Sequence, residues 1–200
     1  MNRRHLWLGF LLPLLMIGCG SQPARFYVLE SESSTVPAVS LPELVLGVGP
    51  VRLATYLERP QIVSRIRSSQ LEVEEFDRWG GSLEANITWV MADNLAHRLG
   101  TQAVVTFPWE RAVIPLYQVT VDIRRFDLLR DDRIFLDAQW RIMNEDGRRL
   151  LVIRTTGVEE PVLEGTLEGQ IVARSRALAR LSDDIATAIQ TLMNRSSSTR

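Results

Sequence analysis

A short apolar run near the N-terminus sets the limits within which the rest of the chain has to fold. Residues 6–17 are almost all apolar and follow Arg3 and Arg4, which is the charge order of a secretory signal peptide. The run is too short to cross a bilayer as a helix, which takes about 20 residues. We therefore predict that residues 1–18 are a signal peptide and that residues 19–200 make one exported domain around a single hydrophobic core.

Cys19 directly follows this segment and is the only cysteine in the sequence. With Met16, Ile17 and Gly18 before it, the stretch resembles the bacterial lipobox, with Met at the position where Leu is usual. A lone cysteine has no disulfide partner within the chain, and a free thiol is a liability in an oxidising compartment. Acyl chains such as palmitate supply the several anchors that stable membrane attachment requires. We predict lipidation of Cys19; the alternative is an ordinary secreted protein with a stray cysteine at its cleavage site.

The residue after the cysteine bears on which membrane holds the protein. Gly20 occupies this position, where Asp retains lipoproteins in the inner membrane of enteric-type bacteria. The absence of Asp favours the periplasmic face of the outer membrane, under a sorting rule that differs between bacterial lineages.

Charge argues against general nucleic-acid binding. The formal net charge is −1, and the two signs are mixed along the chain, whereas nucleic-acid binding requires a basic face. All 23 basic residues are arginine. This bias has two explanations that the sequence leaves open: genomic codon usage, or a preference for bidentate contacts to phosphate or carboxylate.

Composition shifts divide the exported part into three segments. Residues 19–42 are expected to form a lipidated tether and spacer, with a short strand near residues 25–30 and a flexible stretch rich in Ser and Pro over residues 31–42. Residues 43–194 are expected to form the folded domain. Residues 195–200 are polar, and we predict a disordered tail there.

Two helices are predicted from apolar residues at helical spacing. Residues 82–99 form the first, with Ser82 as its N-cap and Gly100 at the C-terminal position that favours glycine. Residues 168–193 form the second, whose regular apolar stripe fits core packing better than an oligomer seam.

Strands are predicted from alternating or short apolar runs. The last three are joined by short, turn-rich connections, which predicts an antiparallel meander. The fold class that follows is α/β (α+β): a single domain in which a mixed or largely antiparallel sheet packs against two long helices. The expected strands are residues 43–51, 60–66, 71–76, 103–107, 116–128, 133–143 and 148–158.

The sequence offers little that resembles an active site. His97 is the only histidine after the predicted signal peptide, and a lone histidine without a second His or Cys argues against a zinc or copper site. No nucleophile-elbow motif points to a reactive serine. We therefore expect no enzyme activity, no catalytic residue, no metal and no cofactor.

Two segments contain residue types that are typical of a defined structural or binding role. Arg59 and Pro60 precede a predicted strand, and Arg78 and Trp79 precede the first predicted helix. Pro fixes the backbone where a strand starts, and Trp seats a loop. Arg and Trp are also favoured anchors at protein interfaces. From these residues alone the structural interpretation is preferred, and a partner or subunit interface is the alternative.

Taken together, these segments resemble the PqiC (YmbA) family of lipoproteins, described as auxiliary lipoprotein components of ABC-type transport systems. The order and spacing of the motifs match from about residue 25 to residue 193. The chain departs from the family pattern after Trp79, where Gly-Gly-Ser-Leu replaces a Pro-Leu ending, so that a serine cap takes the place of proline. The matching motifs are Cys19, residues 26–29, residues 49–51, residues 56–65 and residues 75–79.

The resemblance implies a non-enzymatic adaptor or docking subunit of an intermembrane lipid-transport system. Such proteins are lipid-anchored at the outer membrane, work with periplasmic MCE-domain proteins and assemble as homo-oligomeric rings. In that case Cys19 is the anchor, and the loops of Arg59-Pro60 and Arg78-Trp79 are candidates for subunit or partner contact.

Two other functions compete with this one. A lipoprotein activator or scaffold for a periplasmic cell-wall enzyme predicts a peptidoglycan-synthesis partner and no MCE association. A hydrolase using His97 predicts that replacing this residue abolishes an activity and leaves the fold intact.

Overall fold

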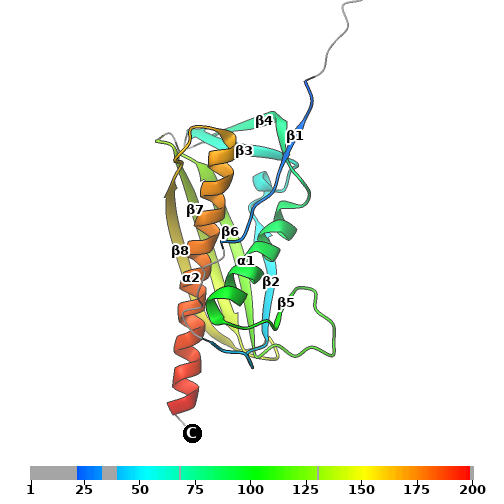
Figure 1. Cartoon of the computed structure of the whole chain (residues 1–200), viewed down its shortest axis with the longest axis vertical. Coiled ribbons are helices and arrows are strands. Elements are labelled where there is room, and N and C mark those ends of the chain that lie inside the picture. The colour runs from blue at the N-terminus through cyan, green and yellow to red at the C-terminus, as the bar shows by residue number, and fades with distance from the viewer. Residues whose placement is uncertain (1–21, 33–39, 68, 130, 199–200) are drawn as a thin grey trace, which may run out of the picture.

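The computed structural model describes residues 22–32, 40–67, 69–129 and 131–198. The predicted signal peptide and Cys19 lie outside these residues, as does part of the predicted spacer. Within them the chain forms one α+β domain in two layers, with helices on one face of a large sheet and a second, smaller sheet at one end (Figure 1).

The large sheet has five strands in the order β5-β2-β6-β7-β8. β2 is parallel to both β5 and β6, whereas β6, β7 and β8 form the antiparallel meander that the short connections predicted. Alternate residues of β6 and β7 point to the covered face and are buried, as a sheet with one solvated face requires. The strands are β2 (Leu46–Leu53), β5 (Val104–Thr106), β6 (Tyr117–Leu128), β7 (Arg133–Met143) and β8 (Leu150–Pro161).

Both predicted helices are confirmed. α1 (Leu83–Leu99) starts as expected, because the Ser82 hydroxyl accepts a hydrogen bond from the Ala85 N–H at 3.2 Å. It ends at Gly100, whose φ of 59° is the left-handed conformation that glycine adopts readily. α2 (Leu167–Ser198) runs along the sheet and is longer than predicted. Four residues of the expected disordered tail, 195–198, are helical instead, since α2 continues to Ser198.

The small sheet was not expected, because the sequence predicted only one sheet. It contains β1 (Arg25–Tyr27), β4 (Gln70–Trp79) and β3 (Gln61–Arg67), in the order β1-β4-β3. β1 pairs with β4 in parallel, and β3 pairs with β4 as a hairpin. A short 3-10 helix, η1 (Thr55–Leu57), connects the large sheet to the small one. In Figure 1 the small sheet lies at one end of the molecule and the C-terminus of α2 at the other.

One chain of polar contacts joins three elements, from the buried core to the surface of α2. Trp140 of β7 is fully buried, and its indole N–H donates to the Thr156 hydroxyl of β8 at 3.0 Å. That hydroxyl donates in turn to the Asp184 carboxylate of α2 at 2.7 Å. Buried Tyr and Trp side chains usually find such partners, and here the chain of bonds fixes how α2 lies across the meander.

The packing of α2 predicts a large difference between two positions on this helix. Leu178 is fully buried, whereas Val172 is 53% exposed. We expect Leu178→Ala to lower the free energy of unfolding by about 2–5 kcal/mol, through lost burial and the cavity left behind. Val172→Ala, the matched control, should change it by less than about 0.5 kcal/mol. Urea unfolding of the domain lacking residues 1–19 measures both, and equal effects would contradict this packing.

Candidate docking cleft

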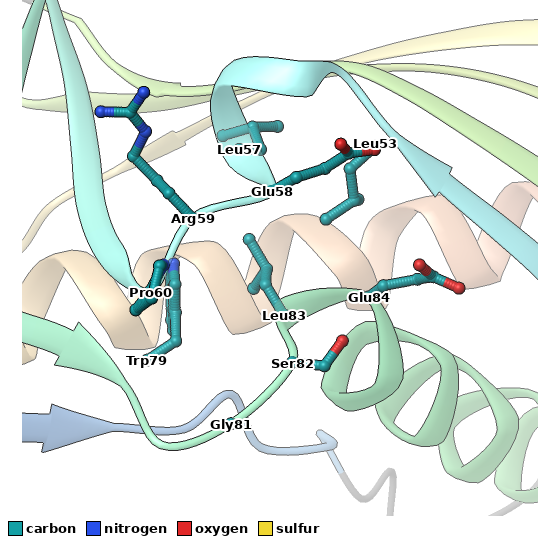
Figure 2. A pocket seen from close by; sticks show the side chains of 10 residues that line it. All are labelled: Leu53, Leu57, Glu58, Arg59, Pro60, Trp79, Gly81, Ser82, Leu83 and Glu84. Atoms are coloured by element: carbon teal, nitrogen blue, oxygen red, sulfur yellow. The ribbon is translucent and has the colours of Figure 1, made fainter.

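A cleft of about 510 Å³ opens between the end of β2, the turn after η1, and the start of α1. It is built from two stretches of chain that are separated in the sequence by the β3–β4 hairpin. Its lining residues are Leu53, Leu57, Glu58, Arg59, Pro60, Trp79, Gly81, Ser82, Leu83 and Glu84 (Figure 2).

Backbone hydrogen bonds at the end of β4 bring these two stretches together. The Trp79 N–H donates to the Pro60 carbonyl at 2.7 Å, and the Gly80 N–H donates to the Tyr27 carbonyl at 2.8 Å. The first bond closes the hairpin beside the cleft, and the second ties the same point to β1. The chain then turns through Gly81 to the Ser82 cap, which places the first residues of α1 on the opposite wall.

The cleft has an apolar floor and a charged rim. Leu57, Trp79 and Leu83 are each less than 10% exposed and belong to the hydrophobic core. Figure 2 shows Leu57 and Leu83 approaching each other from η1 and α1. The exposed rim carries a basic side chain at one end and acidic ones at the other: Arg59 lies beside Pro60, while Glu58 and Glu84 extend toward the far side.

Three of the four residues predicted as interface candidates meet in this cleft. Arg59, Pro60 and Trp79 line it. Arg78 does not, because successive residues of a strand point to opposite faces and Arg78 stands next to Trp79 in β4. The expectation that Arg78 and Trp79 lie in a loop is wrong, since β4 extends through both. The Arg78 Nε is buried and has no hydrogen-bond partner among the described residues.

Sequence reasoning missed the residues that give the cleft its shape. Leu53 is at the end of β2, and Leu83 begins α1. Leu83 falls within the first predicted helix, and Leu53 lies beyond the strand predicted over residues 43–51. The apolar periodicity that predicts an element does not show which elements meet. Glu58 and Glu84 carried no signal either, since both resemble solvated helix and turn positions.

A buried polar cluster fixes η1, and with it one wall of the cleft. The Asp127 side chain is fully buried in β6 and accepts from the Tyr56 hydroxyl at 2.7 Å. It also accepts from Arg65 at 2.9 Å and from Arg125 at 3.0 Å. A buried carboxylate requires such partners. Because Tyr56 lies between Thr55 and Leu57, its bond to Asp127 sets where the Leu57 side chain enters the cleft.

The same cluster changes the chemistry of the Tyr56 hydroxyl. Burial is the main cause that raises the pKa of Tyr56 to about 12, and the hydrogen bond to Asp127 adds to it. Both causes favour the protonated hydroxyl, which donates to the carboxylate, over a phenolate buried beside it.

Alkaline unfolding tests this cluster. The Tyr56 pKa is raised in the folded state. Its contribution to the free energy of unfolding is therefore complete below about pH 10, which is the pKa of a free tyrosine. It is lost as the pH rises toward about 12, because the unfolded chain releases the proton first. We expect the free energy of unfolding to fall over this window, and to fall less steeply in Tyr56→Phe. Identical slopes, measured by denaturant unfolding at several pH values, would contradict the raised pKa of Tyr56 in this buried cluster.

Neither a metal site nor a membrane span is found in the described part of the chain. No group of three or more His, Cys, Asp or Glu side chains is placed there to hold a metal ion. None of its helices combines the length and the apolarity needed to cross a bilayer. His97, the residue of the hydrolase alternative, is exposed on α1 and does not line the cleft.

Comparison with solved structures supports the fold. One crystal structure of an uncharacterised protein superposes with a TM-score of 0.69 at 17% identity, covering 84% of this chain and 99% of the other. A Xanthomonas campestris protein of the DUF330 family gives a TM-score of 0.68 at 17% identity, covering 88% and 99%. The PelC dodecamer from Paraburkholderia phytofirmans is more distant, with a TM-score of 0.44 at 10% identity, covering 74% and 90%.

Sequence comparison gives the family. No curated protein matches the chain. The model of one family, described as the ABC-type transport auxiliary lipoprotein component, matches residues 27–186. This range includes the large sheet, β3 and β4 of the small sheet, the cleft and most of α2. The resemblance inferred from the motifs is thereby confirmed, and the chain belongs to the ABC-type transport auxiliary lipoprotein family.

Proposed function

We propose that this lipoprotein is a non-enzymatic adaptor that docks a protein partner in the cleft between η1 and α1. The observation that carries the proposal is the pairing of an apolar floor with an exposed charged rim. Protein interfaces have this arrangement, with a desolvated centre that supplies most of the affinity and polar surroundings that exclude water.

The lining favours binding over catalysis. A nucleophilic serine needs a base within hydrogen-bond reach, and Ser82 instead uses its hydroxyl to cap α1. The two carboxylates of the lining, Glu58 and Glu84, are both exposed, whereas acid–base pairs on one site are tuned by unequal burial. The cleft therefore resembles a receptor surface more than an active site.

The charges of the rim indicate what kind of segment fits. A partner would insert an apolar side chain between Leu57 and Leu83 and place a basic residue near Glu58 and Glu84. Arg59 at the other end would meet an acidic group. Complementary charge of this kind selects the orientation of a partner more than it adds affinity.

The proposed partner is a periplasmic MCE-domain protein, with the adaptor held at the outer membrane by Cys19 and assembled as a homo-oligomeric ring. This assignment rests on the family: its members are auxiliary components of transport systems, and a non-enzymatic docking role fits the lining of the cleft. A cell-wall synthase that the lipoprotein activates is the alternative partner.

Filling the cleft tests the proposal. Gly81 lines the cleft, has open space beside its Cα and has no positive φ, so a side chain fits there without backbone strain. We expect Gly81→Trp to obstruct the cleft and to reduce co-purification of the MCE-domain partner about tenfold, the effect of losing one good anchor. The measurement is quantitative mass spectrometry after capture of the acylated protein from cells in mild detergent.

A matched control is available on the same chain. Gly165 is also exposed, with nothing within 4 Å of an added Cβ, and it lies outside the cleft. Gly165→Trp should leave the partner bound. Equal recovery with Gly81→Trp and Gly165→Trp would show that the cleft is not the docking surface. Recovery of a cell-wall synthase without an MCE-domain protein would replace the transport function with the activator function.

A further inference from the structure

The first described strand is fixed to the body of the domain by both backbone and side chains. Arg25 donates to both carboxylate oxygens of Asp77, at 2.6 and 2.8 Å. Leu29 is buried, and its N–H and carbonyl bond the side chain of Asn86 at 2.7 and 3.2 Å. The body of the protein therefore begins at Arg25.

The contacts continue into the segment that was expected to be a spacer. The Glu30 N–H donates to the Ser175 hydroxyl of α2 at 3.1 Å, and the Glu32 N–H donates to Asn94 of α1 at 3.0 Å. Residues 29–32 thus belong to the body of the domain. Only the residues between Cys19 and Arg25 remain to link the body to the lipid.

This link is short. Cys19 precedes Arg25 by six positions in the sequence, and an extended chain advances at most about 3.5 Å per residue, so the two Cα atoms are within about 20 Å of each other. α2 alone, with 32 residues, is about 48 Å long. An acylated Cys19 therefore holds the end that carries β1 at the membrane, with the C-terminus of α2 at the far end (Figure 1).

Apolar side chains are exposed at that same end. Phe26 is 66% exposed and Val28 55% exposed. Phe26 lies within β1 and Val28 directly follows the strand, next to the half-buried Tyr27 and the buried Leu29. Single exposed apolar residues are common on proteins, but these two follow the lipid-bearing cysteine within ten positions.

Val28 also lines a groove beside the start of α2. The groove has a volume of about 330 Å³, and its lining combines Tyr27, Val28, Ile171 and Val172 with the acidic side chains of Glu30, Glu32 and Glu168. Val172 is 53% exposed. Apolar surface thus extends from the end of β1 to the start of α2.

We propose that Phe26 and Val28 rest in the headgroup region of the bilayer that holds the lipid anchor, so that the domain lies directly on the membrane in one orientation. The occupant of this surface is lipid, because the length of the link leaves β1 within reach of the bilayer. A covalent anchor together with a second weak contact is the combination that gives stable membrane attachment. The proposal rests on lipidation of Cys19 and is independent of the partner of the cleft.

A fluorescent label can read this contact directly. Since Cys19 is the only cysteine and is consumed by acylation, an introduced cysteine is the only free thiol. The acylated Phe26→Cys variant, labelled with an environment-sensitive fluorophore, is reconstituted in vesicles of phosphatidylethanolamine and phosphatidylglycerol. Quenching by a lipid-borne nitroxide then reports whether position 26 touches lipid.

Two controls use equally exposed positions. Ile114, 71% exposed, lies in the connection from β5 to β6, and Trp89, 62% exposed, lies on the surface of α1. We expect the label at position 26 to shift to shorter wavelength and to be quenched at least threefold more than labels at Ile114→Cys or Trp89→Cys. Val28→Cys should behave like Phe26→Cys.

Other outcomes overturn the proposal. Equal quenching at positions 26 and 114 would mean that the domain has no fixed orientation on the bilayer. The label at position 26 could also shift to shorter wavelength without being quenched. If that shift occurs only at a high protein-to-lipid ratio and disappears on dilution into excess vesicles, a second copy of the chain covers the surface. Neither result depends on the docking cleft, so failure here is distinguishable from failure of the proposed function.

Discussion

The end of β4 is the point on which the rest of the structure depends. Two consecutive N–H groups there reach in different directions: Trp79 bonds Pro60 beside the cleft, and Gly80 bonds Tyr27 of β1. The cleft wall and β1 are thus held by adjacent peptide groups. A change that loosens this point would disturb the cleft and β1 together, and with them the small sheet, whose Ile62 and Trp79 belong to the hydrophobic core.

The large sheet and both helices could be predicted from the sequence, because the apolar residues of each element recur at the spacing of a strand or of a helix. Alternate residues of β6 and β7 are buried, and Ser82 and Gly100 mark the ends of α1. The small sheet could not be predicted in the same way. β1 is three residues long and pairs with β4 in parallel across about fifty intervening positions, and no local pattern encodes a partner so far away.

The candidate site was predicted only in part, because the sequence does not show which distant segments meet. Arg59, Pro60 and Trp79 stood out by residue type, and the fold brings them together. Arg78 stood out equally, yet the alternation of β4 turns it away from its neighbour. Asn86 of α1 holds the Leu29 backbone against this helix, a role that its residue type alone did not indicate. Residue type suggests a role, but only the register of a strand or the face of a helix decides it.

The short link between Cys19 and the body of the domain restricts how the proposed adaptor would work. With a lipid on Cys19, the end of the domain that carries β1 would stay within about 20 Å of the anchored cysteine. The Ser-rich stretch after β1 adds no reach, since residues 29–32 are bonded to both helices. In the proposed function, a partner from the opposite membrane would therefore have to span the distance itself and reach the cleft, which lies at the end of the molecule that carries β1. The hydrogen bonds that hold one short strand thus favour a receiving role for this chain over a spanning one.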